Sequence, residues 1–243
     1  MPARLPDFLG LGTQKGGTTS LHQWLNTHPQ VFLPTCKEVH YFDLQPEQPT
    51  SWYAKHFQEA HQEQVCGEIT PFYLFHPDVP ARIRSTLPAV RMIILLRDPV
   101  ERTLSQIFHA RKRGFETLSP EEALEAEPYR LQSGNLESLQ KHSYVSRSRY
   151  LEQLDRYEKL FPQNQLLILK SEIFFTDPET AWNKILNFLG VNTILKSSSL
   201  PKANKGDGAS MANKIGLRNK LREELATTAL GVRQRYGFGW DWA

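Results

Sequence analysis

The distribution of hydrophobic and polar residues picks out four short apolar segments of the chain. They are FLGLG (8–12), QVCGEIT (64–70), VRMIILL (90–96) and QLLILKS (165–171). Apolar runs of this length are typical of strands that are buried on both faces of a sheet. Stretches long enough to form helices lie between them. This alternation predicts an α/β fold with a central parallel sheet flanked by helices.

Residue types at helix ends mark two of the helices. We expect one to begin at Pro178, after the capping residue Asp177, and to end before Gly190. The apolar stripe of this helix is formed by Trp182, Ile185, Leu186 and Leu189. A second helix is expected over residues 144–161, where apolar residues recur at helical spacing until Pro162 ends the helix.

The composition indicates an ordinary globular protein without a strong bias toward one kind of partner. The chain of 243 residues is 40% hydrophobic and 23% charged, and its formal net charge is only +3. A charge this small does not favour a general nucleic-acid-binding protein, so a strong anion site must come from local clustering. The basic stretches HARKRG (109–114) and NKIGLRNKLREEL (213–225) are more simply explained as solvated helix faces or helix ends than as nucleic-acid or lipid patches.

Length, cysteine spacing and apolar runs lead to three further expectations. A chain of 243 residues suits one α/β domain, so we expect a single domain over residues 1–243. Cys36 and Cys66 lie far apart and lack metal-ligand spacing, which predicts two reduced thiols and no zinc site. The chain has no run of about eighteen apolar residues, so we expect a soluble, cytoplasmic protein without stable membrane insertion.

The loop after the first apolar segment has the residue types of an anion-binding site. In TQKGGTTSL (13–21), Lys15 precedes the glycines Gly16 and Gly17, and the hydroxyl residues Thr18, Thr19 and Ser20 follow. Glycines let the backbone approach a ligand closely, and the first amides of a helix bind phosphate or sulfate. Because the lysine precedes the glycines, this is not a Walker A loop, and magnesium-dependent triphosphate chemistry is less favoured. A tight structural turn is the alternative explanation.

A second basic position follows the third apolar segment. Arg97 ends that segment at the carboxyl edge of the predicted sheet, where open α/β folds bind ligands. The next helix is expected to begin with Asp98 as its cap, Pro99 at its first position and Glu101 completing a capping box. Ser105 lies two turns into this helix and can reach the same ligand. The alternative is that Arg97 only pairs with Asp98 or Glu101.

The segment KEVHYFD (37–43) combines acids, bases and aromatic residues outside any helical pattern. Glu38 or His40 can act as a general base if it is partly buried, because burial raises the pKa of a carboxyl group toward neutral pH. A surface position or a satisfied buried group is the commoner explanation for either residue, and His109 is a weaker candidate. Aromatic residues that either wall an acceptor site or belong to the core are Tyr41, Phe42, Phe72, Tyr73 and Phe75.

Six motifs taken together resemble the PAPS-dependent sulfotransferases. In chain order they are TQKGGTTSL (13–21), KEVHYFD (37–43), GEITPFYL (67–74), LLRDPVERTLSQ (95–106), YLEQLDRYEKLFP (150–162) and NKGDG (204–208). The resemblance is closest to the branch that includes the heparan sulfate N- and O-sulfotransferases and many bacterial relatives. It implies the sulfotransferase fold, a P-loop-NTPase-like three-layer arrangement. It also implies transfer of a sulfuryl group from 3′-phosphoadenosine 5′-phosphosulfate (PAPS) to a hydroxyl or amine of an acceptor.

The resemblance implies a role for several residues on the donor side. The residues that match the loop binding the 5′-phosphosulfate group are Lys15, Gly16, Gly17, Thr18, Thr19 and Ser20. Among them, Lys15 matches the residue that neutralises charge on the bridging oxygen. Arg97 and Ser105 match the pair that binds the 3′-phosphate, and Lys205 and Gly206 match a late loop that closes over the nucleotide. The product is then 3′-phosphoadenosine 5′-phosphate (PAP), and no metal ion is implied.

The match is less complete on the acceptor side. Glu38 matches the glutamate proposed as general base, and His40 stays a second catalytic candidate. Heparan O-sulfotransferases have a lysine where this chain has Ile69, and several relatives have an arginine where it has Asp207. The acceptor therefore stays open between a small molecule and a carbohydrate, and so does the oligomeric state.

Two other classes of protein share parts of this pattern. A nucleotide kinase or another P-loop phosphotransferase has the same order of strand, loop and helix, but its Walker lysine would follow the glycines and an acidic residue would hold magnesium. A non-catalytic nucleotide-binding module would keep the fold and lack the chemistry. The presence of both Lys15 and Glu38 argues against such a module.

Overall fold

The computed structural model describes residues 4–193 and 215–243, which form two compact units. Residues 4–96 and 154–193 make up the first unit, and residues 97–153 and 215–243 make up the second. The strands found in the described residues all belong to the first unit.

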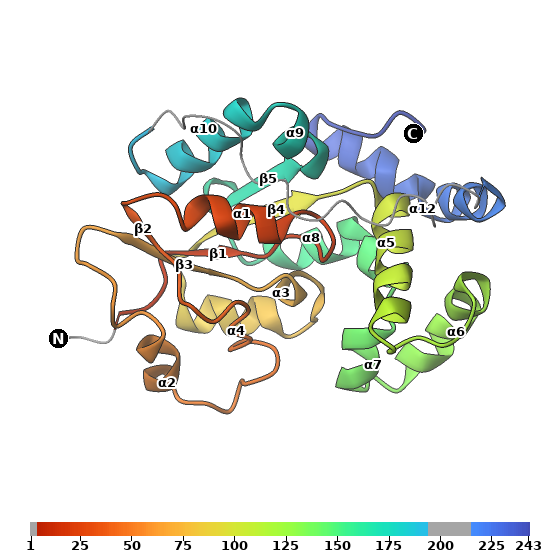
Figure 1. The fold of residues 1–243 in the computed structure, drawn as a ribbon, viewed down its shortest axis with the longest axis horizontal. Helices are drawn as coiled ribbons and strands as arrows, with labels where there is room; N and C mark the ends of the chain where they lie inside the picture. The colour runs from red at the N-terminus through yellow and green to blue at the C-terminus, as the bar shows by residue number, and fades with distance from the viewer. Residues whose placement is uncertain (1–3, 194–214) are drawn as a thin grey trace. The chain divides into compact units, whose positions relative to one another are not determined.

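The first unit is built around a five-stranded sheet (Figure 1). The strand order is β2-β3-β1-β4-β5, with β1 (Phe8–Gly10), β2 (Val31–Phe32), β3 (Val65–Ile69), β4 (Arg91–Leu96) and β5 (Leu166–Lys170). The four strands predicted from the apolar segments are confirmed, each shorter than its segment. β2 escapes prediction because its two residues are too few to form a pattern.

Every pair of neighbouring strands in this sheet is parallel. β1 lies in the middle, with Phe8 paired to Gly67 of β3 on one side and to Arg91 of β4 on the other. The carboxyl ends of the strands therefore lie at one edge, and the loops that follow β1, β2 and β3 begin there. A parallel sheet with helices packed on its faces confirms the predicted α/β fold.

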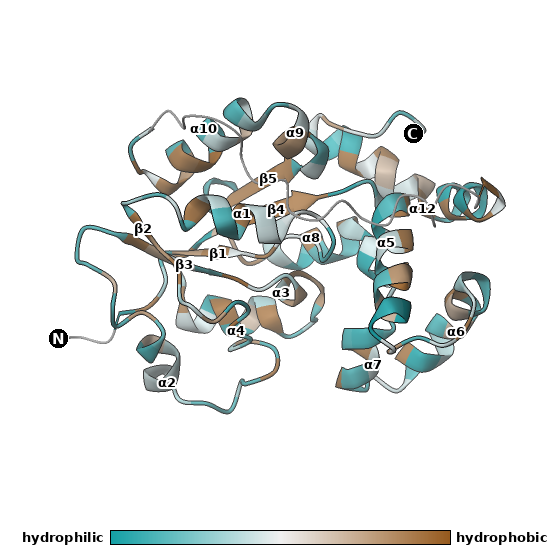
Figure 2. Ribbon diagram, viewed as in Figure 1, coloured by the Kyte–Doolittle hydropathy of each residue, from teal (hydrophilic) through white to brown (hydrophobic). Residues whose placement is uncertain are grey.

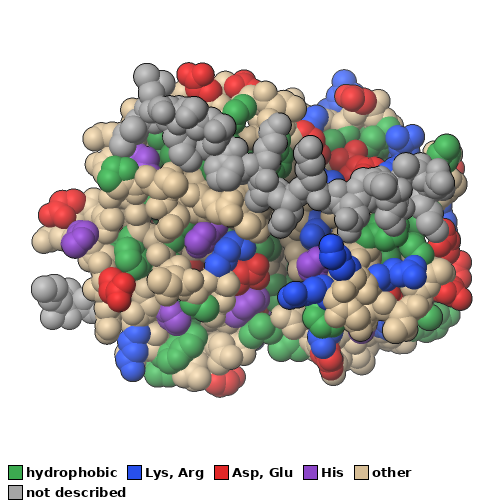
Figure 3. All heavy atoms as spheres, viewed as in Figure 1, with side chains coloured by type: hydrophobic (Ala, Val, Ile, Leu, Met, Phe, Trp, Pro, Cys, Tyr) green, Lys and Arg blue, Asp and Glu red, His purple; other side chains and the backbone are tan. Residues whose placement is uncertain are grey.

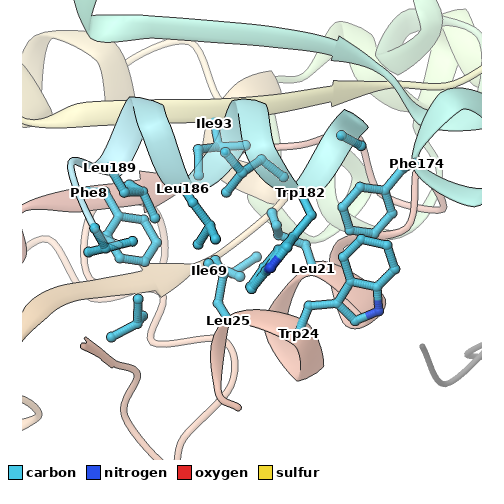
Figure 4. Close-up of a cluster of buried hydrophobic side chains, with 14 of the residues drawn as sticks. Phe8, Leu21, Trp24, Leu25, Ile69, Ile93, Phe174, Trp182, Leu186 and Leu189 are labelled. Atoms are coloured by element: carbon cyan, nitrogen blue, oxygen red, sulfur yellow. The ribbon is translucent and has the colours of Figure 1, made fainter. Parts of the chain in front are cut away.

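Three helices cover one face of this sheet, namely α1 (Thr18–Leu25), α9 (Ser171–Thr176) and α10 (Pro178–Leu189). Trp24 of α1 stacks on Phe174 of α9 with ring centroids 3.9 Å apart, and Trp182 of α10 meets Trp24 edge-on (Figure 4). Such pairs add stabilisation beyond the burial of their surface. The predicted apolar stripe of α10 is buried, and the Asp177 side chain accepts the predicted capping bond from the Thr180 amide at 3.2 Å.

The opposite face of the sheet is covered by α3 (Phe72–Phe75) and α4 (Val79–Thr86), as Figure 1 shows. α2 (Thr50–Lys55) lies between β2 and β3 in the chain, and the 3-10 turn η2 (Gln163–Gln165) leads into β5. From Leu154 onward, α8 (Tyr150–Glu158) also belongs to the first unit. There the Tyr157 hydroxyl donates a hydrogen bond to the Tyr73 carbonyl at 2.7 Å, which ties α8 to α3.

The predicted helix over 144–161 is wrong at both ends. The structure has a 3-10 turn, η1 (Ser146–Ser148), before α8 begins at Tyr150, and α8 ends at Glu158. The side chain amide of Gln153 donates hydrogen bonds to the carbonyls of residues 146, 147 and 149. The Ser146 carbonyl also accepts from the Arg149 amide at 3.3 Å, which is the i to i+3 bond of a 3-10 turn, so this segment departs from α-helical geometry before Tyr150.

The second unit contains the helices α5 (Pro99–Lys112), α6 (Pro120–Gln132), α7 (Leu136–Lys141) and α12 (Ile215–Tyr236). Leu104 of α5 packs in one hydrophobic cluster with Leu221 and Leu225 of α12. Glu127 of α6 is buried, and its carboxylate accepts hydrogen bonds from the amides of residues 144, 145 and 146 at 2.8, 2.8 and 2.9 Å. This carboxylate therefore satisfies three donors of the segment that leads into η1.

Hydrophobic residues follow the buried layers of the first unit. Figure 2 shows them along β4 and β5 and on parts of α9 and α10. On the face shown in Figure 3, basic and acidic side chains are both present, and histidines lie among them. Among the helices of residues 4–193 and 215–243, none is both long and apolar enough to cross a bilayer.

Candidate active site

The loop after β1 folds against the end of β4. Thr13 donates from its amide and from its hydroxyl to the carbonyl of Leu95, at 2.9 and 3.0 Å, and the Gly16 amide donates to the Thr13 carbonyl at 2.8 Å. A Cβ atom on Gly16 would lie 2.4 Å from Thr13 Oγ1 and 2.9 Å from the Thr13 carbonyl oxygen. Both distances are shorter than atoms tolerate, so the turn requires glycine at this position.

The first amides of α1 are available to an anion. Gly17 precedes the helix with a φ of 97°, a conformation that favours glycine. Within the described chain, no side chain caps α1 and its first turn contains no acidic residue. Thr19 is exposed and Lys15 is half-buried, whereas Thr18 and Ser20 are buried. The Ser20 hydroxyl oxygen has no hydrogen-bond partner among the described residues.

This combination fits a phosphate or sulfate group better than a purely structural turn. The N-terminus of a helix carries partial positive charge and unpaired N–H groups. Lys15 adds a full positive charge to the same loop, and its φ of 71° is unusual for a residue with a side chain. An unusual backbone conformation of this kind is found mainly where the surrounding structure enforces it, often at a ligand site.

The first turn of α9 holds the loop from the other side. The Ser171 hydroxyl donates a hydrogen bond to the Gly16 carbonyl at 2.6 Å, and Ser171 is buried. The Phe175 ring lies over Gly17, where a Cβ atom would come within 3.0 Å of it. Sequence reasoning missed Ser171 because it is 155 residues from Gly16 in the chain. The position of Ser171 at the carboxyl end of the fourth predicted strand was the available signal.

A second cluster of charged residues lies in the segment between β2 and α2. His40 Nε2 is 3.2 Å from a carboxylate oxygen of Glu38, and His40 Nδ1 is 2.9 Å from a carboxylate oxygen of Asp43. Lys37 Nζ is 3.4 Å from the other oxygen of Glu38. Asp43 is buried and also accepts a hydrogen bond from the Leu44 amide at 2.6 Å. One imidazole thus bridges two carboxylates.

The pKa values of this cluster differ from the sequence-based expectation. Burial by itself would raise the pKa of Glu38, but the hydrogen bond to His40 and the positive charges of Lys37 and His40 lower it below its usual value. Burial would lower the pKa of His40, yet the hydrogen bonds to Asp43 and Glu38 and their charges raise it to about 9. At neutral pH, Glu38 is therefore ionised and His40 is protonated.

Sequence reasoning did not single out Asp43, although it lies in the KEVHYFD segment. The spacing of three residues between His40 and Asp43 was a usable signal, because acids and histidines this close in a non-helical segment often pair. The positive φ of His40, 58°, turns the backbone so that its imidazole reaches both carboxylates. Such a turn is not readable from the sequence, since histidine rarely adopts it.

The β1 loop and the charged segment belong to the same edge of the sheet. Lys15 follows β1, and Glu38 and His40 follow β2, which are parallel members of one sheet. Half-buried His22 of α1 has its pKa lowered by burial and by the charge of Lys37, so α1 lies near the charged segment. The structure thus assigns two sets of predicted residues, an anion-binding loop and a carboxylate held by an imidazolium, to one edge.

Two further predicted residues belong to the second unit. The Arg97 carbonyl accepts a hydrogen bond from the Tyr150 hydroxyl at 2.7 Å, and Ser105 is half-buried on α5. Asp98 caps α5 as predicted, accepting from the amides of residues 100 and 101 at 2.8 and 3.1 Å. Glu101, expected to complete the capping box, instead pairs with Arg218 at 2.8 Å because α12 packs against α5.

The remaining candidates have different outcomes. Lys205, Gly206 and Asp207 lie outside the described residues. His109 is half-buried on α5 in the second unit. Of the aromatic residues that were expected either to wall an acceptor site or to pack in the core, Phe75 is half-buried, and the buried ones are Tyr41, Phe42, Phe72 and Tyr73. Core packing is therefore the explanation that the structure favours for these four.

Comparison with known proteins gives one consistent result. A family model described as "Sulfotransferase domain" matches residues 5–224. "Membrane-associated sulfotransferase kil1" of Dictyostelium discoideum is 44% identical over 105 residues, which are 42% of this chain and 22% of that protein. "Heparan sulfate glucosamine 3-O-sulfotransferase 5" of Mus musculus is 28% identical over 193 residues, 77% of this chain and 54% of that protein. The chain thus spans about half the length of the heparan sulfate enzyme and about a fifth of the length of kil1.

A solved structure extends the likeness to the whole fold. The crystal structure of a sulfotransferase from Alicyclobacillus acidocaldarius superposes with a TM-score of 0.83 and 27% sequence identity, covering 98% of this chain and 99% of that one. The predicted sulfotransferase fold, with its P-loop-like parallel sheet between layers of helices, is therefore confirmed. Because the family match extends over most of its residues, the chain belongs to the sulfotransferase domain family.

Proposed function

We propose that this chain is a sulfotransferase that uses PAPS to sulfate a hydroxyl or amine of its acceptor. The observation that carries the proposal is the arrangement at the edge of the sheet. There the loop with Lys15 and the first main-chain amides of α1 follow β1. An ionised Glu38, paired with protonated His40, follows β2. Membership in the sulfotransferase domain family supports this function, and the match over residues 5–224 supports a single sulfotransferase domain.

The β1 loop is proposed to bind the phosphosulfate group of PAPS. Sulfuryl transfer leaves negative charge on the phosphate oxygen, so catalysis depends on donors and positive charge placed at that oxygen. Lys15 would supply the charge, and the first amides of α1 would supply donors. The assignment of Arg97 and Ser105 to the 3′-phosphate, and of Lys205 and Gly206 to a closing loop, rests on the resemblance alone.

Glu38 is proposed as the general base. Its carboxylate takes the proton of the acceptor hydroxyl while the acceptor oxygen bonds to sulfur and the bond from sulfur to the phosphate oxygen breaks, which releases PAP. The lowered pKa of Glu38 keeps it ionised, the state that can accept a proton. His40, with a pKa raised to about 9, is already protonated, so we assign it the role of orienting Glu38.

A carbohydrate hydroxyl is the acceptor class to test first. One relative is named as a sulfotransferase of heparan sulfate glucosamine, which is a carbohydrate. Specificity is expected in the segment 115–143, which includes α6 and α7, because variable segments carried on a shared scaffold usually determine substrate choice. Transfer of labelled sulfate from PAPS to a panel of sugars, lipids and small alcohols would identify the class.

Nucleotide titration tests the proposal directly. PAP should bind roughly 100-fold more tightly than ATP, because ATP lacks the 3′-phosphate and its charge-assisted hydrogen bonds. Isothermal titration calorimetry with and without magnesium should show no magnesium requirement for PAP. Tighter binding of magnesium-ATP would favour the kinase alternative. Tight binding of PAP without sulfate transfer to any acceptor in the panel would favour the non-catalytic module.

A further expected result concerns the α9 contact with the loop. Ser171→Ala removes the hydrogen bond to the Gly16 carbonyl and should weaken PAP binding about three- to tenfold, the equivalent of about 0.5–1.5 kcal/mol. Thr176→Val is the matched control, because its hydroxyl donates to the Glu172 carbonyl within α9, at 3.1 Å, and not to the β1 loop. Equal PAP affinity of the two variants by calorimetry would show that Ser171 does not hold the loop.

A further inference from the structure

A buried carboxylate lies beneath the charged segment. Glu68 of β3 is fully enclosed, as are the tyrosines that bind it. Tyr53 and Tyr73 each donate their hydroxyl proton to the same oxygen, Glu68 Oε1, at 2.8 Å, and Thr70 donates to Glu68 Oε2 at 2.6 Å. Burial raises the pKa of Glu68, and the hydrogen bonds from the three hydroxyl groups counter this effect only in part.

One of the two tyrosines also reaches the charged segment. The Phe42 amide donates to the Tyr73 hydroxyl oxygen at 3.3 Å, so this hydroxyl both donates to Glu68 and accepts from the main chain. Phe42 lies between His40 and Asp43, the imidazole and the buried carboxylate described above. Its carbonyl accepts a further hydrogen bond from Arg82 at 2.8 Å. The main-chain amide and carbonyl of Phe42 are therefore both held by hydrogen bonds to side chains.

Among the described residues, the side-chain hydroxyl of Tyr53 bonds Glu68 as that of Tyr73 does, but it lacks the bond from the Phe42 amide. The Tyr53 ring stacks on Tyr41 with centroids 4.2 Å apart, but its hydroxyl hydrogen bond runs to Glu68 and not to the segment 38–43. Both tyrosines are fully buried and bond the same carboxylate oxygen at the same distance. Removing the Tyr53 hydroxyl breaks a hydrogen bond to Glu68. Removing the Tyr73 hydroxyl breaks an equivalent bond and also the link to the charged segment.

We propose that Tyr73, oriented by Glu68, is a positioning residue that fixes the Phe42 amide and thereby the His40–Asp43 pair that holds Glu38. The inference rests on the proposed function, since positioning matters for turnover only if Glu38 is the base. The chain of contacts runs from Glu68 of β3, a strand with a neighbour on each side in the sheet, through the buried Tyr73 hydroxyl to the main chain of the segment. A buried hydrogen-bond network of this kind holds reacting side chains in place better than surface contacts do.

The first test reads the position of His40 without any substrate. In the wild-type protein the His40 pKa, raised to about 9 by Asp43 and Glu38, is measured by NMR titration, with its resonance identified among the eight histidines from a His40→Gln spectrum. Tyr73→Phe should lower this pKa by about one unit or more toward its usual value, whereas Tyr53→Phe should leave it near 9. Equal shifts in the two variants, or no shift in either, would overturn the proposal.

Thermal melts check that the variants fold. Amide exchange in the wild-type protein tests the contact between Phe42 and Tyr73 independently of any variant. If Tyr73→Phe does not fold, exchange of the Phe42 amide decides the question. Protection of that amide well above the level of exposed amides supports the contact with Tyr73, and exchange at the rate of exposed amides overturns it.

The second test reads turnover. With an acceptor identified, Tyr73→Phe should lower kcat about 10- to 100-fold without changing PAP affinity, because misplacing a reacting group slows chemistry rather than donor binding. Tyr53→Phe should lower kcat far less. A parallel loss of PAP affinity and kcat in Tyr73→Phe would mean a general structural role. If the wild-type protein does not bind PAP, the proposed function fails, and the His40 titration still decides whether Tyr73 positions the segment.

Discussion

Lys15→Ala is expected to reduce sulfuryl transfer by roughly 10²- to 10³-fold or more, to the point where turnover is no longer measurable, while the protein stays folded. In the proposed mechanism the lysine supplies positive charge at the leaving oxygen, and charge stabilisation at that position is usually a large part of catalysis. Lys15 is half-buried in a loop at the edge of the sheet and contributes nothing to the hydrophobic clusters. Its loss should therefore act on chemistry and donor binding rather than on folding.

The measurement is the initial rate of labelled sulfate transfer, accompanied by a thermal melt and a PAP titration. Lys159→Ala is the control, because Lys159 is an exposed lysine of the same unit outside both the loop and the charged segment. The control should retain the wild-type rate. Near-normal turnover of Lys15→Ala would remove the proposed mechanism, even if PAP still binds.

Glu38→Gln is expected to lower kcat about 10²- to 10⁴-fold, the usual contribution of a general base, and to leave PAP affinity nearly unchanged. An amide keeps the shape of the side chain and can still contact His40, but it cannot take a proton from the acceptor. The donor loop after β1 is a separate segment of the chain, so nucleotide binding should persist. Steady-state kinetics with saturating PAPS and calorimetry with PAP measure the two effects separately.

Glu59→Gln is the matched control for Glu38, since Glu59 is an exposed glutamate of the same unit. It should be indistinguishable from wild type in both assays. A Glu38→Gln variant that loses PAP affinity in proportion to kcat would recast Glu38 as a structural residue of the donor site. Unchanged kcat together with unchanged affinity would remove it from the mechanism altogether.

The sequence predicted the parts of the fold that depend on local pattern. The strands β3, β4 and β5 lie in mainly apolar segments, and α10 is bounded by residues whose capping preferences are strong, Asp177 and Gly190. The sequence-based prediction failed where contacts from a neighbouring side chain accompany a change in backbone conformation. The helical spacing lies mainly after Tyr150, and the expected start of the helix at residue 144 is wrong because residues 146–148 form a 3-10 turn whose carbonyls at 146 and 147 accept hydrogen bonds from the Gln153 side chain.

The candidate site divides in the same way. The residues of the β1 loop are contiguous, so the glycine pair and Lys15 were visible as a group. Ser171 and Tyr73 were not, because their partners Gly16 and Phe42 are 155 and 31 residues away. Ile69, which replaces a lysine of the heparan O-sulfotransferases, is buried in the same hydrophobic cluster as Trp24, a packing role that its position in a motif did not reveal.

The sequence by itself determined the alternation of four of the five strands with helices, the grouping of Lys15 with a glycine pair after β1, and the presence of an acid and a histidine in the segment 37–43. These follow from the spacing of apolar residues and from the local preferences of glycine, proline and capping residues. Only the tertiary structure decided that Glu38 has a lowered pKa and that His40 is protonated. A pKa depends on burial and on charges a few ångströms away, and folding alone brings Lys37, His40 and Asp43 to those distances.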